Sequence, residues 1–370
     1  KNEFIQKYKN IIRLGSILFI VFFSCKSDES NENGNGSTNY TEFNIPVSER
    51  WSIPYQDPVI SFGDTINNAQ WNSPFVIFEN RKFIMFLSAN VGDFGEEVVP
   101  FRAESNNGIN WNIDKNSLLA SNREPTSIDF NGIESPTVVR FNGLYHMYYT
   151  AIPQNIVGSI TIGHATSENG IDWIKDKNNP VLEPSGEISE WNGIQVADPG
   201  AVVINNELFL YFAAESAGGS DSIPANTSSI GLAISPDGYQ FGPQQQILTV
   251  GLPYSFADGF TGYGSPAAIH ENETVHLFYD VFYYNENENI SLVRVALHHA
   301  SSADGITNWV QDQEAIFTRN MFSWGKREIR APTAVVGENM LHLWFGGDDL
   351  ISDNSKWGIG YATTNMDFLE

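Results

Sequence analysis

Five copies of one proline-centred segment constrain the fold of this chain more than any other feature of its sequence. The prolines are spaced by 62 to 67 residues, and they are Pro74, Pro136, Pro199, Pro266 and Pro332. In every copy a β-branched residue follows three positions after the proline, and an aromatic residue follows twelve positions after it. A polar turn separates the two apolar runs, which is the pattern of a β-hairpin. The chain is therefore predicted to contain five similar hairpins.

A second shared pattern follows each hairpin. In the first copy it reads Ala103, Ser105, Gly108 and Trp111, and it recurs in the next two copies without a gap. The fourth copy has one inserted residue, and the fifth is shortened. This pattern predicts a third strand with a glycine turn, and a short apolar pair such as Val181-Leu182 predicts a fourth strand. Four-stranded antiparallel repeats of this length are typical of propeller blades.

The predicted fold class is all-β, a five-bladed β-propeller with four-stranded antiparallel blades. The last repeat lacks its fourth strand, and the segment Asp57-Pro58-Val59-Ile60 resembles Asn179-Pro180-Val181-Leu182. We expect this N-terminal segment to supply the missing strand and close the ring, because an open sheet edge leaves backbone groups unpaired. Residues 50–370 are then one propeller domain.

The first 49 residues have a different composition. Basic residues precede an apolar run from Leu14 to Phe23, and Cys25, the one cysteine of the chain, follows after Ser24. A basic segment followed by a short apolar run is typical of an export signal, and this one resembles the signal of a bacterial, Bacteroidetes-type lipoprotein. Residues 1–24 are then a signal peptide, Cys25 is the lipidation site, and residues 25–49 are a flexible polar tether. The resemblance implies an exported lipoprotein held at the outer membrane by its lipid anchor alone.

The charge and the residue spacing exclude several kinds of partner. The chain has 20 basic and 44 acidic residues, a net charge of −24. Such a surface repels nucleic acid and anionic lipid. A single cysteine permits no intramolecular disulfide and no cysteine-based zinc site. Aspartates with EF-hand spacing do not occur, so we expect no metal and no cofactor.

Acidic side chains are predicted to meet at the centre of the ring. In an antiparallel blade the first strand begins, and the second strand ends, on the same rim. Glu134 and Asp198 flank the repeat prolines of adjacent blades, and Glu215 and Asp280 lie at the ends of second strands. Mutual repulsion raises the pKa of some carboxyls in such a cluster. One carboxyl can then act as an acid while another stays ionised, which is what hydrolysis of a glycosidic bond needs.

Other polar and aromatic residues are predicted to line the same rim. Flat aromatic rings suit the apolar faces of sugars, and polar side chains suit their hydroxyl groups. The predicted substrate contacts, besides Glu215, are Trp71, Asn72, His164, Trp191, Trp324 and Arg330. His146, His276 and His342 share one repeat position, which indicates packing within the blades.

The chain resembles the five-bladed propeller glycosidases, a group that holds glycoside hydrolase families 32, 43, 117 and 130. The resemblance is carried by Gly132 to Pro136, Leu144 to Thr150 and Ile162 to Ser167. It implies that Glu134, in a Glu-x-Pro pattern, is the general acid and that Asp198, in an Asp-Pro pattern, orients the sugar or tunes that acid. It also implies an aspartate before the proline of the first blade, which acts as the base or nucleophile.

The first blade departs from that pattern, because it reads Asn72-Ser73-Pro74. The base is then another residue, Asp280 or Glu215, or hydrolysis has been lost. The favoured hypothesis is a glycoside hydrolase that acts on a polysaccharide or oligosaccharide with inversion, with Asp280 as the candidate base. The alternatives are a non-catalytic glycan-binding propeller and a family 130-like phosphorylase. In the latter, Arg330, Lys326 and Arg327 would bind phosphate.

Overall fold

The computed structural model describes residues 45–91, 97–154, 160–217, 227–285, 290–348 and 356–370. The predicted signal peptide, the lipidation site Cys25 and most of the predicted tether lie outside these ranges, so they stay predictions. Within the described ranges no helix is both long enough and apolar enough to cross a membrane.

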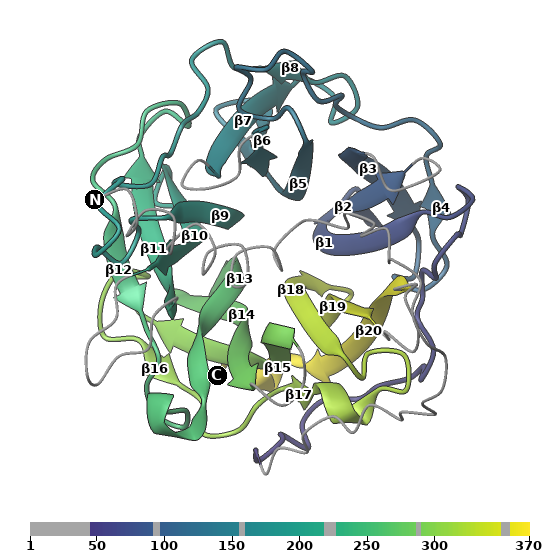
Figure 1. The fold of residues 1–370 in the computed structure, drawn as a ribbon. Helices are drawn as coiled ribbons and strands as arrows, with labels where there is room; N and C mark the ends of the chain where they lie inside the picture. The colour runs from purple at the N-terminus through teal and green to yellow at the C-terminus, as the bar shows by residue number, and fades with distance from the viewer. Residues whose placement is uncertain (1–44, 92–96, 155–159, 218–226, 286–289, 349–355) are drawn as a thin grey trace, which may run out of the picture.

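The fold is all-β, as the repeats predicted, and its strands form five groups around a common centre (Figure 1). The first three strands of each group pair antiparallel in order. Any short strands that follow pair antiparallel with the third strand. The first group comprises β1 (Gln70–Glu79), β2 (Lys82–Val91), β3 (Glu97–Ser105) and β4 (Asn112–Ile113). The second comprises β5 (Gly132–Phe141), β6 (Leu144–Ile152), β7 (Thr161–Ser167) and β8 (Ile174–Lys175). The third comprises β9 (Gln195–Ile204), β10 (Glu207–Ser216), β11 (Thr227–Ser235) and β12 (Gln245–Leu248).

The remaining two groups complete the set. The fourth comprises β13 (Phe260–Glu271), β14 (Thr274–Asn285), β15 (Ile290–Ser302), β16 (Val310–Gln311) and β17 (Phe317–Thr318). The fifth comprises β18 (Glu328–Gly337), β19 (Met340–Asp348) and β20 (Trp357–Asn365). The helical segments described are short 3₁₀ turns, and they are η2 (Phe256–Asp258), η4 (Arg319–Met321) and η5 (Met366–Leu369). The fourth strand of the second group differs from the prediction, because Val181-Leu182 forms only an isolated bridge to Ile162. Pro180 has no N–H, so the ladder cannot extend through it.

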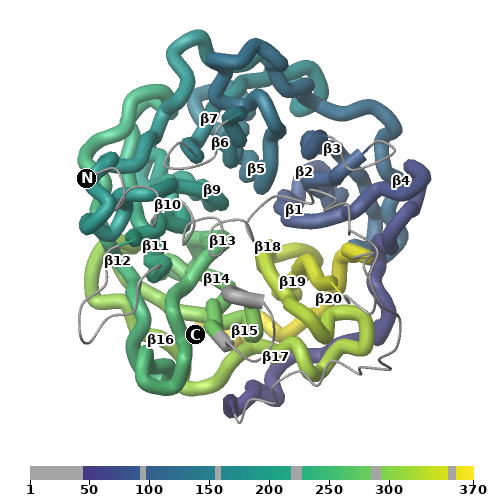
Figure 2. The backbone as a smooth tube through the Cα atoms, in the orientation of Figure 1, coloured from purple at the N-terminus to yellow at the C-terminus, as the bar shows by residue number. Residues whose placement is uncertain are grey.

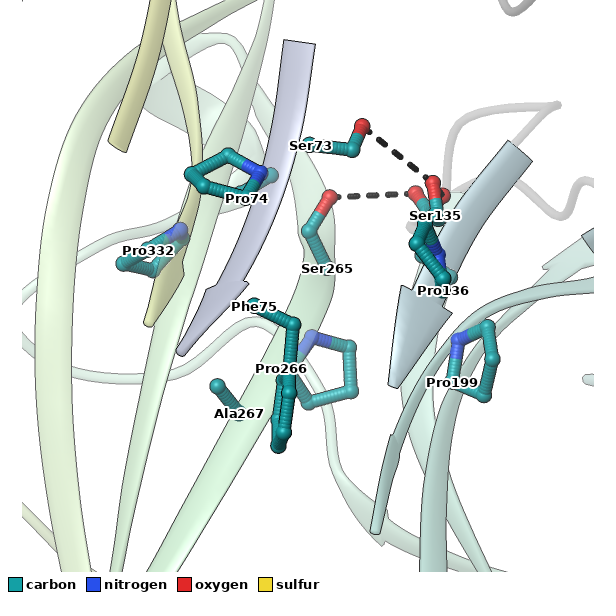
Figure 3. Close-up of a pocket in the computed structure, with 12 residues that line it drawn as sticks. Ser73, Pro74, Phe75, Ser135, Pro136, Pro199, Ser265, Pro266, Ala267 and Pro332 are labelled. Atoms are coloured by element: carbon teal, nitrogen blue, oxygen red, sulfur yellow. Dashed lines mark hydrogen bonds between the residues drawn. The ribbon is translucent and has the colours of Figure 1, made fainter. Parts of the chain in front are cut away.

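Each first strand contains a bulge at its repeat proline. The pairing register shifts there in all five groups. The residue before the proline has a left-handed φ of 45° to 51° in every group, and these residues are Ser73, Ser135, Asp198, Ser265 and Ala331. Such a conformation costs a non-glycine residue about 1–3 kcal/mol. A bulge re-aims a side chain, and these five residues with their prolines line a pocket at the centre of the molecule (Figure 3).

Neighbouring groups are joined by a hydrogen bond that recurs with the repeat. In the second, third and fifth groups, the aromatic residue twelve positions after the proline donates to the carbonyl of the turn glycine in the adjacent group. The pairs are Tyr148 with Gly238 (2.7 Å), Tyr211 with Gly305 (2.8 Å) and Trp344 with Gly108 (2.8 Å). Gly108 has a left-handed φ of 72°, which explains the glycine of the repeat. The pair of Trp344 and Gly108 joins the fifth group to the first.

The N-terminal part of the described chain lies against the fifth group (Figure 2). Ile60 forms an antiparallel bridge to Ile359 on β20, and Ser52 forms another to Thr363. The backbone N–H of Val59 donates to the carbonyl of Ile359 at 2.8 Å. Ile60 is only 1% exposed and packs in one hydrophobic cluster with residues of the first and fifth groups. The segment 57–60 therefore lies beside the last strand, where its resemblance to the second repeat predicted it.

Candidate functional site

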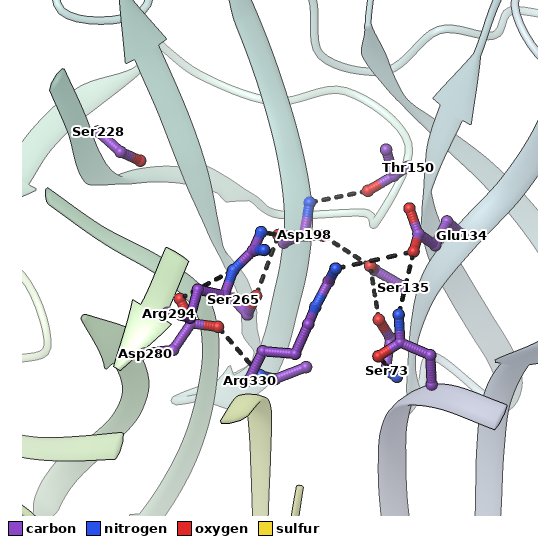
Figure 4. Close-up of polar contacts among 12 residues, drawn as sticks. Ser73, Glu134, Ser135, Thr150, Asp198, Ser228, Ser265, Asp280, Arg294 and Arg330 are labelled. Carbon is purple, nitrogen blue, oxygen red and sulfur yellow. Dashed lines mark hydrogen bonds and ion pairs between the residues drawn. The ribbon is translucent and has the colours of Figure 1, made fainter. Parts of the chain in front are cut away.

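Asp198 lies in the central pocket and has both carboxylate oxygens engaged (Figure 4). Its Oδ1 accepts a hydrogen bond from the Ser135 hydroxyl at 2.6 Å, and its Oδ2 accepts one from the Ser265 hydroxyl at 3.0 Å. Its backbone N–H donates to the Thr150 hydroxyl at 2.8 Å. The side chain is fixed by serine hydroxyls of the two neighbouring strand groups, so it provides a positioned negative charge.

Glu134 on β5 is 5% exposed, and its two oxygens have different surroundings. Oε1 lies 3.4 Å from the Asn72 Nδ2 donor and 3.7 Å from the Arg330 guanidinium. Asn72 is held in this orientation because its own Oδ1 accepts the Ser73 N–H at 2.7 Å. Oε2 is buried and has no hydrogen-bond partner in the described part of the chain. Glu134 is therefore a carboxyl with one oxygen held and one oxygen available.

Burial sets the protonation of Glu134. Loss of solvation raises its pKa from 4.5 to about 7. The positive charge of Arg330 acts in the opposite direction, and the negative charge of Asp198 adds to the increase. A carboxyl with a pKa near neutrality can carry a proton and release it, which is the property of a general acid.

Arg294 on β15 connects carboxylates from three strand groups, and Figure 4 shows its contacts with Asp198 and Asp280. Its guanidinium lies 3.8 Å from Asp198, 3.4 Å from Asp280 and 3.7 Å from Glu328, and it also lies 4.6 Å from the centre of the Phe282 ring. Burial alone would raise the pKa of Glu328, but the neighbouring arginines together hold it below its ordinary value. The sequence analysis did not identify Arg294, because it lies within a third strand and belongs to no repeated motif.

Asp280 makes a hydrogen bond that recurs at the same position of other repeats. Its Oδ2 accepts the Ala331 backbone N–H at 3.0 Å. Ser88 and Thr150 occupy the same repeat position, and each accepts the corresponding N–H of the next group. The Oδ1 atom of Asp280 makes no hydrogen bond to the described residues, although the Arg294 guanidinium is nearby. Burial raises the pKa of Asp280, and Arg294 acts in the opposite direction.

Glu215 lies near this group on β10. It is 6% exposed and pairs across the strands with Gln195 on β9. Burial raises its pKa to about 7, while the positive charge of Arg294 and the Gln195 amide act in the opposite direction. Arg294 and Asp198 both influence Glu215, so this carboxyl adjoins the central cluster.

The structure does not bring His164 to this cluster. Its ring is fully buried and stacks on Tyr148. Its Nε2 lies 3.0 Å from Nδ1 of His146, and its Nδ1 lies 3.2 Å from the Asp176 carboxylate. Burial lowers the pKa of His164 to about 4. The predicted sugar contact at His164 is therefore not supported, because the ring is enclosed by neighbouring strands.

The predicted aromatic contacts have different outcomes. Trp71 is fully buried, packs on Phe101 and donates to a backbone carbonyl, so it belongs to the core and not to a sugar-binding surface. Trp191 and Trp324 are partly exposed. Trp191 stacks on Phe212 with ring centroids 6.0 Å apart, and Trp324 stacks on a ring of β19. Because both rings are partly exposed, a contact between them and a sugar remains a prediction.

The three basic residues proposed to bind phosphate have different surroundings. Arg327 pairs with Asp348 at 2.6 Å, Arg330 pairs with Glu134, and Lys326 is exposed. Among the described residues, no group of three or more His, Cys, Asp or Glu side chains is arranged to hold a metal ion. The side chains of the cluster are carboxyl and guanidinium groups.

A known protein family has a sequence model that matches part of this chain. The sequence model of the glycosyl hydrolases family 32 N-terminal domain matches residues 129–250, which include Glu134, Asp198 and Glu215. No curated protein sequence matches the chain.

Solved structures of glycoside-active enzymes share the fold. The beta-1,2-mannobiose phosphorylase from Listeria innocua has a TM-score of 0.60 at 15% identity, over 88% of this chain and 98% of that one. A glycosyl hydrolase from Bacteroides ovatus has a TM-score of 0.56 at 16% identity, over 89% and 92%. A thermostable family-43 glycoside hydrolase has a TM-score of 0.58 at 14% identity, over 79% and 89%. The chain thus has the fold of the propeller glycoside hydrolases and their phosphorylase relatives, as the resemblance in its sequence predicted.

Proposed function

We propose that this protein is a glycoside hydrolase that cleaves a glycosidic bond of a polysaccharide or oligosaccharide at the cluster around Glu134. One observation carries the proposal: Glu134 is a buried carboxyl with a pKa of about 7 whose Oε2 has no partner among the residues described. The fold shared with glycoside hydrolases supports the reaction class. We further propose that the five strand groups are five propeller blades, with residues 57–60 closing the ring.

In this proposal Glu134 is the general acid. Asn72 and Arg330 both lie beside Oε1, so the proton is carried on Oε2. Transfer of that proton to the glycosidic oxygen neutralises the leaving group as the bond to the anomeric carbon breaks. Asp198 helps to keep Glu134 protonated through its fixed negative charge, and it orients the sugar.

The candidate base is Asp280, which would take a proton from the water that attacks the anomeric carbon. Its Oδ2 is held by the Ala331 N–H, while Oδ1 accepts no hydrogen bond from the described chain. Attack by water on the face opposite the leaving group inverts the anomeric configuration. Separate acid and base carboxyls with room for water between them are the arrangement of inverting glycosidases.

A phosphorylase is the second candidate function. The environment of the Arg330 guanidinium favours it. Arg330 is 2% exposed, and its Nε and Nη2 atoms make no hydrogen bond within the described ranges. A phosphate at this guanidinium would replace water as the nucleophile. One of the similar structures is a phosphorylase.

A screen of plant, algal and fungal glycans with analysis of products, with and without phosphate, tests both candidates. We expect reducing sugars whose formation does not depend on phosphate. Sugar 1-phosphate formed only in the presence of phosphate would replace hydrolysis with phosphorolysis. Glycan binding without any product would instead support a non-catalytic propeller.

The sequence of residues 1–49 supports a further proposal about location. We propose that Cys25 is lipidated after signal cleavage and that the protein is anchored at the outer membrane. Expression of the full chain in a bacterial host with labelled palmitate tests this. Label is expected in the wild type and absent in Cys25→Ala.

A further inference from the structure

One position of the repeat supplies an acceptor for the bulge of the next strand group. It lies fourteen residues after the repeat proline, and its five residues are Ser88, Thr150, Ala213, Asp280 and Gly346. In three groups its side chain accepts the backbone N–H of the residue before the next proline, as Ser88 from Ser135 (2.9 Å), Thr150 from Asp198 (2.8 Å) and Asp280 from Ala331 (3.0 Å). Ala213 and Gly346 have no side-chain oxygen, so they cannot accept this bond.

Gly346 on β19 lies beside the bulge of the first group, and there the acceptor comes from the bulge itself. The Ser73 N–H donates at 2.7 Å to Oδ1 of Asn72, its neighbour in the chain. A methyl group added to Gly346 would lie 2.8 Å from that Oδ1 atom, well inside the usual separation of non-bonded atoms. The carboxamide of Asn72 therefore occupies the space that a side chain at position 346 would fill.

The bond to the Ser73 N–H fixes which end of the Asn72 carboxamide faces Glu134. A backbone N–H only donates, so the atom beside it is the carbonyl oxygen, and the Nδ2 group is the end that is left. Nδ2 donates to Oε1 of Glu134 at 3.4 Å. Arg330, which pairs with Gly346 across β18 and β19, lies 3.7 Å from the same Oε1 (Figure 4). Both neighbours of Gly346 thus hold one oxygen of Glu134, and Oε2 is left for the proton.

We propose that Gly346 is a positioning residue for Glu134, because its missing side chain leaves the space in which the Asn72 carboxamide is held. This inference rests on the proposed function, since it takes Glu134 to be the group that gives up the proton. The charged groups that act on Glu134 belong to other residues, and a substitution at Gly346 removes none of them. They are Arg330, Asp198, Arg294 and Glu328.

Two substitutions at Gly346 separate its effect on the acid from its effect on the fold. The backbone of Gly346 is not in the left-handed conformation, so it accepts other residues. Gly346→Ser displaces the Asn72 carboxamide, and it supplies a hydroxyl at the repeat position where Ser88 accepts the N–H of the next group. Gly346→Ala displaces the carboxamide and supplies no acceptor. The Tm of Gly346→Ala should therefore be lower than that of Gly346→Ser.

The pKa of Glu134 can be measured without turnover, by ¹³C NMR of the full protein labelled at its glutamate carboxyl carbons. Glu134→Gln assigns the signal. We expect the pKa of Glu134 to be higher in Gly346→Ser than in the wild type by about 0.5, because the ionised carboxylate loses a donor. The alkaline limb of the kcat/KM profile should move in the same direction. A purely structural role of Gly346 would move neither.

Two further variants control the measurement. When Asn72 is already alanine, adding Gly346→Ser should change the pKa of Glu134 little, because both substitutions act through the same hydrogen bond. Gly242→Ser makes the same chemical change at an exposed glycine, where an added Cβ would meet no atom closer than 3.5 Å. The pKa of Glu134 in Gly242→Ser should equal that of the wild type.

The outcomes separate this inference from the proposed hydrolysis. A raised pKa of Glu134 in Gly346→Ser, in a protein that turns over no glycan, would support the positioning role and contradict the hydrolase. Turnover that requires Glu134, together with a pKa of Glu134 that Gly346→Ser leaves unchanged, would do the reverse. If Gly346→Ser does not fold, the double variant with Asn72→Ala should fold, because the clash is removed. Failure of both variants to fold would overturn the inference.

Discussion

The oxygens of the clustered carboxyls differ in what holds them, and that difference suggests a role for each residue. Both oxygens of Asp198 accept hydroxyl hydrogen bonds, which suits a fixed charge. Glu134 has one oxygen held by Asn72 and Arg330 and the other without a partner in the described chain. Asp280 is held by one N–H. The role proposed for each carboxyl therefore depends more on its neighbours than on its sequence motif.

Asn72 is predicted to tune Glu134. Asn72→Asp places a negative charge beside Oε1, which raises the pKa of Glu134 further above its present value of about 7. The alkaline limb of the kcat/KM profile should then move to higher pH by roughly one unit. Asn72→Ala, which removes the donor without adding charge, should move it less. An alkaline limb that stays in place in Asn72→Asp would show that Asn72 does not act on the acid.

Asp280 can be tested with a substitution that the repeat itself suggests. Ser88 occupies the same position in the first group and accepts the same kind of backbone N–H. Asp280→Ser should therefore preserve most of the support for Ala331 but remove the base, and kcat should fall by about 10² to 10⁴-fold with a modest change in Tm. Asp280→Ala should lose both the hydrogen bond to the Ala331 N–H and the base. Activity retained in Asp280→Ser would assign Asp280 a structural role alone.

At the scale of elements, two strand groups contain the same pair of buried histidine rings, and in each the second ring contacts an aspartate carboxylate. Nδ1 of His276 lies 3.1 Å from Nε2 of His299, which lies 3.0 Å from Asp312 through its Nδ1. His146 and His164 form the equivalent chain with Asp176. Burial lowers the pKa of His146, and it lowers those of His164 and His276 to about 4. The rings of His146, His164 and His276 are therefore neutral in the folded protein near pH 7.

This arrangement predicts acid sensitivity. Unfolded histidine binds a proton near pH 6.5, so the stability contributed by the neutral rings is complete above that pH and is lost as pH falls toward about 4. The double variant His146→Phe with His164→Leu copies the apolar residues of the third group, Phe209 and Leu232. Its Tm should fall less between pH 7 and pH 4.5 than that of the wild type, as measured by calorimetry. An equal fall in both proteins would contradict the prediction.

The sequence predicted the strands better than the orientations of side chains. The five repeats predicted each hairpin. The bulges at the prolines turn Ser135 and Asp198 toward the centre in a left-handed conformation, and no sequence pattern predicted this conformation. Trp71 was assigned to the rim although it precedes Asn72, and adjacent strand residues point to opposite faces. Arg294 was missed because its long side chain joins residues far apart in the sequence. The aspartate contact of His164 lay only twelve residues away and was a usable signal.

At the scale of the whole molecule, the last repeat is joined to the beginning of the chain by contacts of several kinds. Trp344 bonds to the turn at Gly108, the Val76 N–H donates to the Thr333 hydroxyl at 3.2 Å, and Ile60 pairs with Ile359. These contacts predict that the described groups unfold together. The N-terminal segment is then part of the cooperative structure.

Ile60 tests this cooperativity. Ile60→Ala removes a side chain that is 1% exposed, and it should cost about 2–5 kcal/mol of unfolding free energy in a single transition. Ile174→Ala, at an isoleucine that is 76% exposed, should cost less than about 0.5 kcal/mol. Circular dichroism and tryptophan fluorescence during denaturation provide the measurement. Equal effects of the two substitutions, or an early step confined to the N-terminal segment, would contradict this cooperativity.

The central claim is that Glu134 donates the proton that breaks a glycosidic bond. The direct measurement compares the wild type with Glu134→Gln on the glycan found by screening, with turnover and binding followed separately. We predict that kcat falls by about 10² to 10⁴-fold in Glu134→Gln while the glycan dissociation constant changes little, because the amide keeps the shape but cannot supply the proton. Turnover by Glu134→Gln at the rate of the wild type would contradict the claim.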